Sequence, residues 1–129
     1  MNENLKFLKE VFESESLPEE SLPEFVFWGR SNVGKSSLIN SITKSKIAKT
    51  SKTPGRTRSL VFFEFEKKIR IIDFPGYGYS KIPKYNEIKV DRLIENYLTQ
   101  RQVLKFIFLL IDARHGIMEI DKKILDQLD

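Results

Sequence analysis

One eight-residue stretch has the residue types and the spacing that bind phosphate. It reads Gly29-Arg30-Ser31-Asn32-Val33-Gly34-Lys35-Ser36 and fits the pattern G-x-x-x-x-G-K-[ST] at every fixed position. Its glycines allow consecutive backbone N–H groups to turn inward onto a phosphate chain, at the positive end of a following helix. We expect Lys35 to reach the outer phosphates and the Ser36 hydroxyl to hold Mg²⁺. The alternative is a glycine-containing turn that happens to carry a lysine and a serine.

A second candidate for binding phosphate and metal is the run Asp73-Phe74-Pro75-Gly76, which follows an apolar stretch. A magnesium ion that bridges two phosphates is partly held by a carboxylate at the end of a neighbouring strand, and Asp73 is placed for this role. Gly76 has no side chain, so its backbone N–H can approach the outermost phosphate, and Gly78 leaves the segment free to reorganise. The segment is therefore predicted to act as a switch, although Asp followed by Pro-Gly also occurs in ordinary turns.

A hydroxyl that closes over the metal from the other side is expected in the basic segment 44–58. Thr57 is the best candidate, with Thr50, Thr53 and Ser59 as competitors. A threonine in a loop also caps helices and stabilises turns, so the residues alone leave this choice open.

The surrounding pattern predicts the elements that would position these groups. The apolar run Phe25–Trp28 is typical of a strand buried on both faces of a parallel sheet. A helix is expected over 35–43, with Leu38, Ile39 and Ile42 on one face. Two β-rich runs, 60–65 and 69–73, are joined across three residues and predict a hairpin.

The C-terminal half continues the alternation of helices and strands. Residues 86–102 have apolar side chains at helical spacing, 103–111 predict a strand buried on both faces, and 117–128 begin a last helical stripe. This order belongs to an α/β fold with three layers and a mostly parallel sheet. Residues 1–23 contain a short amphipathic pattern and two prolines, and we expect a partly mobile lead-in segment before a domain over 24–129.

Composition narrows the function classes. The 129 residues fit one domain, and the absence of cysteine excludes disulfides and cysteine-ligated metals. The longest apolar run, 106–111, is far shorter than the roughly 20 residues of a membrane span. The N-terminus lacks the pattern of a secretory signal, so a cytoplasmic location is expected.

Charge is distributed unevenly along the chain. The net charge is +4, yet residues 1–24 carry −5, which leaves +9 on the remainder. The segment 44–58 holds six Lys or Arg residues and no acidic residue. A partner rich in phosphate, nucleotide or RNA, is expected to meet this part of the molecule, unless the basic residues only keep the domain soluble.

Four motifs in order resemble the EngB (YihA/YsxC) family of ribosome-biogenesis GTPases. They are the glycine loop extended to Ser37, the run Thr53-Pro54-Gly55-Arg56-Thr57, the run Asp73-Phe74-Pro75-Gly76-Tyr77-Gly78-Tyr79, and Asp112-Ala113-Arg114-His115. The similarity covers the chain from about Leu22 onward. It implies a P-loop GTPase fold, GTP or GDP with Mg²⁺ as ligands, and association with the large ribosomal subunit and its RNA, as well as a link to septation and cell division.

The resemblance also implies roles at matching positions. Metal ligands are Ser36 and Thr57, with Thr57 as the threonine of the first switch. Asp73 and Gly76 match the metal-side aspartate and the γ-phosphate glycine of the second switch. The nucleotide-binding set that follows is Gly29, Arg30, Ser31, Asn32, Val33, Gly34, Lys35, Ser36, Ser37, Gly55, Arg56, Thr57, Asp73, Phe74, Pro75 and Gly76.

Tyr77 stands where many small GTPases place the glutamine that orients the attacking water. A phenol cannot do this in the same way, so hydrolysis is expected to be slow without a partner or a cation, and no catalytic residue is assigned. Asn32 matches an asparagine that helps related GTPases hold K⁺; the alternative is an Asn that stabilises its own turn. Arg30 is expected to point outward, and His115 to be solvated.

The motif that reads guanine in this family, of the type Thr/Asn-Lys-x-Asp, is absent from the sequence. The late carboxylates Asp121, Asp126 and Asp129 lie in a helical stripe without that arrangement. We therefore expect a chain that is truncated after its fourth strand and the start of the next helix, with the strand 106–111 left at an unpaired edge. A non-hydrolysing module that binds phosphate or RNA, or a half-site that needs a complementary piece, stays open.

Overall fold

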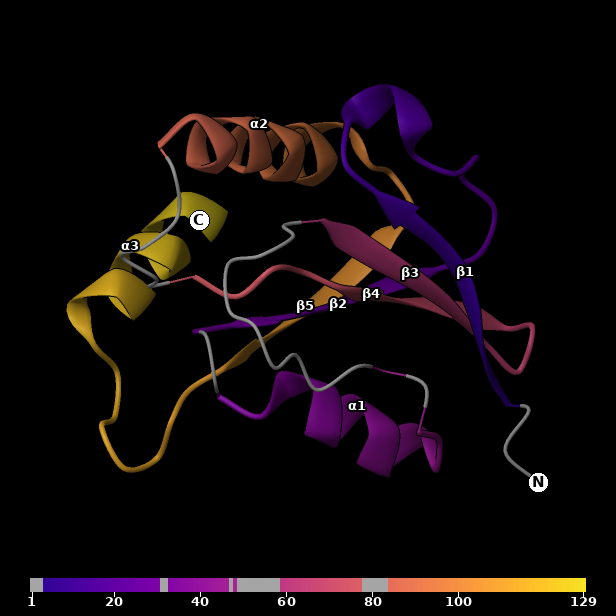
Figure 1. Ribbon diagram of the computed structural model, residues 1–129, viewed down its shortest axis with the longest axis horizontal. Coiled ribbons are helices and arrows are strands. Elements are labelled where there is room, and N and C mark those ends of the chain that lie inside the picture. The colour runs from indigo at the N-terminus through magenta and orange to yellow at the C-terminus, as the bar shows by residue number, and fades with distance from the viewer. Residues whose placement is uncertain (1–3, 31–32, 47, 49–58, 78–83) are drawn as a thin grey trace.

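The computed structural model describes residues 4–30, 33–46, 48, 59–77 and 84–129, without the side chains of 84–87 (Figure 1). Its strands are β1 (Leu5–Val11), β2 (Glu24–Gly29), β3 (Leu60–Phe65), β4 (Ile69–Asp73) and β5 (Leu104–Leu110). Its helices are α1 (Lys35–Thr43), α2 (Lys84–Gln100) and α3 (Glu119–Leu128), with one 3-10 turn, η1 (Ser14–Ser16). None of the described helices is long and apolar enough to span a membrane.

The five strands form one mixed sheet in the order β1-β3-β4-β2-β5. β2 pairs in parallel with both β4 and β5, whereas β3 pairs antiparallel with β1 and β4. The expectation of a mostly parallel sheet was therefore wrong. One antiparallel pairing is the predicted hairpin of β3 and β4, which is confirmed and in which Glu66 and Lys67 take positive φ. The other comes from β1, which the sequence did not predict as a strand.

The N-terminal segment contributes more than a lead-in. Leu5–Val11 forms the edge strand β1, and its terminal residues Leu5 and Val11 are buried against the sheet. Its register shifts between Phe7 and Lys9, which marks a bulge. The amphipathic pattern of this segment is thus strand structure, while the domain boundary at residue 23 stays a prediction.

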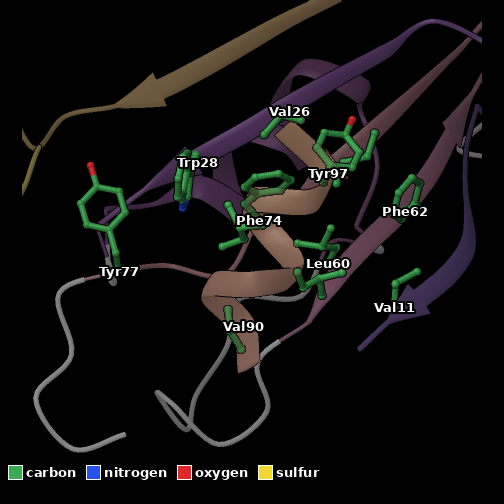
Figure 2. Close-up of a cluster of buried hydrophobic side chains, with 12 residues drawn as sticks. Val11, Val26, Trp28, Leu60, Phe62, Phe74, Tyr77, Val90 and Tyr97 are labelled. Atoms are coloured by element: carbon green, nitrogen blue, oxygen red, sulfur yellow. The ribbon is translucent and has the colours of Figure 1, made fainter. Parts of the chain in front are cut away.

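Helices cover both faces of the sheet, as Figure 1 shows with α2 and α1 on opposite sides. One core cluster lies under α2 and α3 and includes Trp28, Phe62, Phe74 and Tyr97 (Figure 2). The second lies under α1, where Ile39 packs with buried side chains of the sheet. The layered α/β arrangement follows from these two apolar surfaces.

Helix α1 begins and ends where the sequence predicted, but its buried stripe is different. Ile39 and Thr43 are buried, whereas Leu38 and Ile42 are exposed. Residues 39 and 43 are four apart and face the sheet, so residues 38 and 42 are turned by about 100° to the side. The prediction for α2 was confirmed, because Val90, Leu93, Ile94 and Tyr97 are all buried.

Strand β5 lies at one edge of the sheet. Phe106 and Phe108 are 60% and 44% exposed, so the expectation of burial on both faces was wrong for this strand. Its apolar composition reads like that of a central strand, but it pairs only with β2 among the described strands. Phe25 and Phe27 contact these rings from β2, which builds an aromatic row along the edge.

A buried cluster of charged side chains lies at the amino end of β2. Glu24 is fully buried and accepts hydrogen bonds from Tyr97 Oη at 2.8 Å, from Arg101 Nε and Nη2 at 2.9 and 2.8 Å, and from Arg70 Nη1 at 3.1 Å. Arg101 also lies over the rings of Phe62 and Tyr97. The cluster joins β2, β4 and the end of α2 at the edge opposite the glycine loop.

Candidate functional site

The glycine loop follows the carboxyl end of β2 and leads into α1. Gly34 precedes the helix with φ of +92°, a conformation that L side chains rarely adopt, and its carbonyl accepts the first helical bond, from Leu38 N at 3.0 Å. Gly29 is needed for space, because a Cβ there would lie 3.0 Å from both Leu110 O and Val33 Cγ1. The two glycines thus set the path of the chain between strand and helix.

Lys35 and Asp73 meet at this end of the sheet. The Lys35 ammonium forms an ion pair with Asp73 Oδ1, and each side chain is 13% exposed. Burial raises the pKa of the Asp73 carboxyl, and the Lys35 charge opposes that rise. The fold therefore brings together the two charged residues that the sequence placed on opposite sides of one phosphate site.

The backbone after β4 is fixed alongside the glycine loop. Phe74 N donates to Phe27 O at 3.0 Å, Trp28 Nε1 donates to Pro75 O at 3.2 Å, and Tyr77 N donates to Gly29 O at 3.1 Å. Arg30 and Tyr77 form a parallel β-bridge. Gly76 is consequently held between two anchored residues, next to the start of the loop.

Tyr77 is 8% exposed and belongs to the core cluster under α2 and α3, where it lies beside Trp28 (Figure 2). Its hydroxyl donates to Asp121 Oδ1 at 2.6 Å, and its ring meets Trp28 edge-on at 5.8 Å. Burial and the Asp121 carboxylate both raise the pKa of the Tyr77 phenol. With its proton donated to Asp121, this phenol does not orient a water molecule in the observed conformation.

Sequence reasoning did not single out Asp121 for this site. Asp121 is fully buried, and its second oxygen, Oδ2, accepts Met118 N at 2.8 Å as part of the capping box of α3. A signal was available in the sequence, because Asp121 lies three residues before Ile124 and seven before Leu128, which both pack against the core. An acid on the apolar stripe of a helix needs a buried partner.

Arg30 does not simply point outward, which corrects the expectation for that residue. Its Nε is buried and has no hydrogen-bond partner among the described residues, and its charge acts on the Tyr77 phenol. The Arg114 side chain is 79% exposed and pairs with Asp112, while His115 is exposed. Their solvated placement agrees with the sequence expectation for His115.

Several predicted site residues lie outside the described part of the chain. They are Ser31, Asn32, Gly55, Arg56 and Thr57, together with the competing Thr50 and Thr53 and with Gly78 of the predicted switch segment. Of the remaining hydroxyls, Ser36 is half-buried, Ser37 is exposed, and Ser59 is buried and donates to Glu10 Oε2 at 2.7 Å. The roles of all of these residues stay predictions.

The residues present fit a magnesium-bound phosphate group. Ser36 and Asp73 carry oxygen atoms of the kind that Mg²⁺ prefers and would hold the ion, and Lys35 would supply a positive charge to the phosphates. No group of three or more His, Cys, Asp or Glu side chains forms a metal cage within the described residues. A magnesium ion bound with substrate phosphates and a few protein oxygens needs no such cage.

The fold and the glycine loop together define an α/β protein of the P-loop class. Residues 24–129 match the family model of the 50S ribosome-binding GTPases. The chain is 51% identical over 118 residues to the probable GTP-binding protein EngB of Nitrobacter winogradskyi and 46% identical over 123 residues to that of Metamycoplasma arthritidis. These alignments cover 89% and 95% of the chain. The chain belongs to the EngB family of GTP-binding proteins, within the 50S ribosome-binding GTPases.

A solved structure supports the same assignment. The crystal structure of a probable GTP-binding protein EngB matches with a TM-score of 0.63 and 30% identity over 81% of this chain. The alignments span 54% and 67% of the two relatives and 63% of the solved chain. The chain thus corresponds to about three fifths of the length of the relatives it matches.

Proposed function

We propose that the chain binds GTP and GDP with Mg²⁺ at the glycine loop and hydrolyses GTP to GDP and phosphate. The contact between Lys35 and Asp73 carries this proposal, because it brings a phosphate-binding lysine and a metal-side carboxylate to one point from elements 38 residues apart. Membership in a family of 50S ribosome-binding GTPases supports guanine nucleotide as the ligand. When bound, Mg²⁺ would neutralise charge on the outer phosphates.

Each residue of the predicted site has one role in this proposal. The loop from Gly29 to Ser37 surrounds the phosphates, with Lys35 on the outer ones and Ser36 on the metal. Thr57 is the second metal ligand, and Gly55 and Arg56 approach the nucleotide with it. Asp73 stands on the metal side, and the segment 74–76 presents the Gly76 N–H to the third phosphate.

Isothermal titration of the chain with GTP, GDP and ATP tests the ligand. Selective binding of GTP and GDP supports the proposal. Equal binding of all three favours the second candidate, a non-hydrolysing phosphate-binding module. The absence of the Thr/Asn-Lys-x-Asp motif from this sequence favours that candidate. Binding that appears only after addition of the C-terminal part of a relative indicates a half-site that needs a complementary piece.

Hydrolysis is proposed to be slow in the isolated chain. The Tyr77 hydroxyl is committed to Asp121, so it supplies no help to an attacking water. Asn32 is proposed to help hold a K⁺ ion that provides charge at the phosphates. Turnover measured in potassium and in sodium buffers tests this ion, and equal rates count against it.

The partner proposed for the nucleotide-bound chain is the large ribosomal subunit during its assembly, in the cytoplasm. The basic segment 44–58 is suited to RNA phosphates. The double variant Lys49→Ala and Arg58→Ala should weaken RNA binding and lower its dependence on salt. Unchanged affinity and salt dependence would make this segment only a solvated surface. A link to septation and cell division rests on the resemblance alone.

A further inference from the structure

The segment that carries Gly76 is anchored at both ends by side chains of the core. Before Gly76, the Pro75 carbonyl accepts the Trp28 indole N–H at 3.2 Å. After it, Tyr77 is fixed twice, by its backbone to Gly29 and by its hydroxyl to Asp121. The position of Gly76 therefore depends on a bond that reaches helix α3, 44 residues further along the chain.

Asp121, the third residue of α3, takes part in the capping box from an unusually buried position. A capping side chain satisfies free N–H groups at a helix start and functions well at the surface. This carboxylate is instead fully buried, and none of the four ion pairs within the described residues includes it. Burial of a carboxylate is costly unless its oxygens are hydrogen-bonded, and one of its two oxygens is devoted to Tyr77.

We propose that Asp121 is a positioning residue that acts through Tyr77. By accepting the phenol proton, it holds the segment 73–77 against the glycine loop and keeps the Gly76 N–H in reach of the third phosphate. The inference rests on the proposed nucleotide-binding function. Since Gly76 would contact the third phosphate only, the bond contributes to binding of a triphosphate and not of a diphosphate.

The fold contains a matched control for this bond. Tyr97 is also a buried phenol that donates to a buried carboxylate, Glu24, at 2.8 Å. That pair lies at the amino end of β2, away from the glycine loop. Tyr77→Phe and Tyr97→Phe thus remove the same group from the same kind of contact at opposite ends of one strand.

The test measures GTP and GDP affinity, each with Mg²⁺, for the wild-type chain and both variants. Trp28 is the single tryptophan and touches Tyr77, so its fluorescence reports on this segment. We expect Tyr77→Phe to weaken GTP binding about five- to tenfold while GDP binding changes less than about twofold. Before nucleotide is added, its Trp28 emission should shift to longer wavelength. Tyr97→Phe should leave the ratio of the two affinities and the emission unchanged.

Other outcomes count against the proposal. A GTP-to-GDP ratio in Tyr77→Phe equal to that of wild type overturns it, as does an equal drop in Tyr97→Phe. If circular dichroism shows that Tyr77→Phe does not fold, Asp121→Ala replaces it, because this variant removes the acceptor of the Tyr77 hydroxyl; an unchanged GTP-to-GDP ratio there also overturns the proposal. A wild-type chain that binds neither nucleotide refutes the proposed function itself, and this inference with it.

Discussion

The two ends of β2 hold charged side chains in contrasting surroundings. At the amino end, Glu24 accepts four hydrogen bonds from two arginines and a tyrosine. Beside the carboxyl end, on the neighbouring strand β4, Asp73 has one described partner, Lys35. A carboxylate whose acceptor sites are filled by the chain is suited to hold elements together. One that has acceptor sites left is suited to exchange partners, which a phosphate and metal site requires.

The largest effect is expected from Glu24→Ala. It leaves the Arg70 and Arg101 guanidinium groups buried without their shared counter-charge, so the free energy of unfolding should fall by about 3–5 kcal/mol. Urea denaturation measures this loss. Glu95→Ala, at an exposed position on α2, is the control and should change stability by less than about 0.5 kcal/mol. Similar losses in both variants would contradict a structural role for the amino end.

At the other end of the strand, Lys35→Ala should affect binding more than folding. Loss of a charged hydrogen bond to phosphate costs about 2–3 kcal/mol, so GTP and GDP affinity should fall roughly 30- to 150-fold in titration calorimetry. Lys123→Ala, on the exposed side of α3, serves as the matched charge control. If Lys35→Ala destabilised the chain as much as Glu24→Ala, the contrast between the two ends would disappear.

At alkaline pH the free energy of unfolding should fall, because a buried tyrosine hydroxyl lies near each end of β2. The folded structure raises the pKa values of Tyr77 and Tyr97 above the ordinary value of 10. Each phenol thus contributes stability that is complete below pH 10 and is lost as pH rises toward its folded pKa. The loss is at most about 1.4 kcal/mol per pH unit for each tyrosine. Denaturation curves from pH 9 to 11 test this prediction. Each Tyr→Phe variant should reduce the slope of the free energy of unfolding against pH, and an unaltered slope would contradict the prediction.

The smallest effect is expected outside this strand, at an exposed ion pair. Arg114 holds the pKa of the Asp112 carboxyl at about 2, mainly through its hydrogen bonds. In Arg114→Ala, carboxyl NMR should find that pKa raised toward the ordinary value, while urea denaturation at pH 7 should find no measurable change. The small stabilising contribution of the Asp112 ionised form is present above its unfolded pKa and is lost as pH falls toward 2. A clear loss of stability at pH 7 would show that this surface pair is structural.

Much of the candidate site could be predicted because it is local in the sequence. The glycine loop, the helix that starts at Lys35 and the hairpin around residues 66–68 are each defined within a few consecutive residues. The position of Asp73 also followed, since a parallel sheet brings the carboxyl ends of its strands to one edge. These features need only backbone geometry and short spacing rules.

The errors arose where distant segments meet. Nothing within Leu5–Val11 specifies that it pairs with β3. The edge position of β5 was predicted, but its apolar composition does not reveal that Phe106 and Phe108 are exposed there. The bond between Tyr77 and Asp121 depends on α3 packing against the α2 face of the sheet. Periodicity identifies the buried side of an element but not the partner that buries it.

The sequence alone therefore determined the phosphate-binding motif, the family and most of the elements, since these depend on neighbouring residues. Only the tertiary structure decided which strands lie side by side, which carboxylates are buried and which tyrosine meets each of them. Those outcomes depend on how the elements pack against one another. Hydrogen bonds between residues 44 or 73 positions apart become visible only when the whole sheet is assembled.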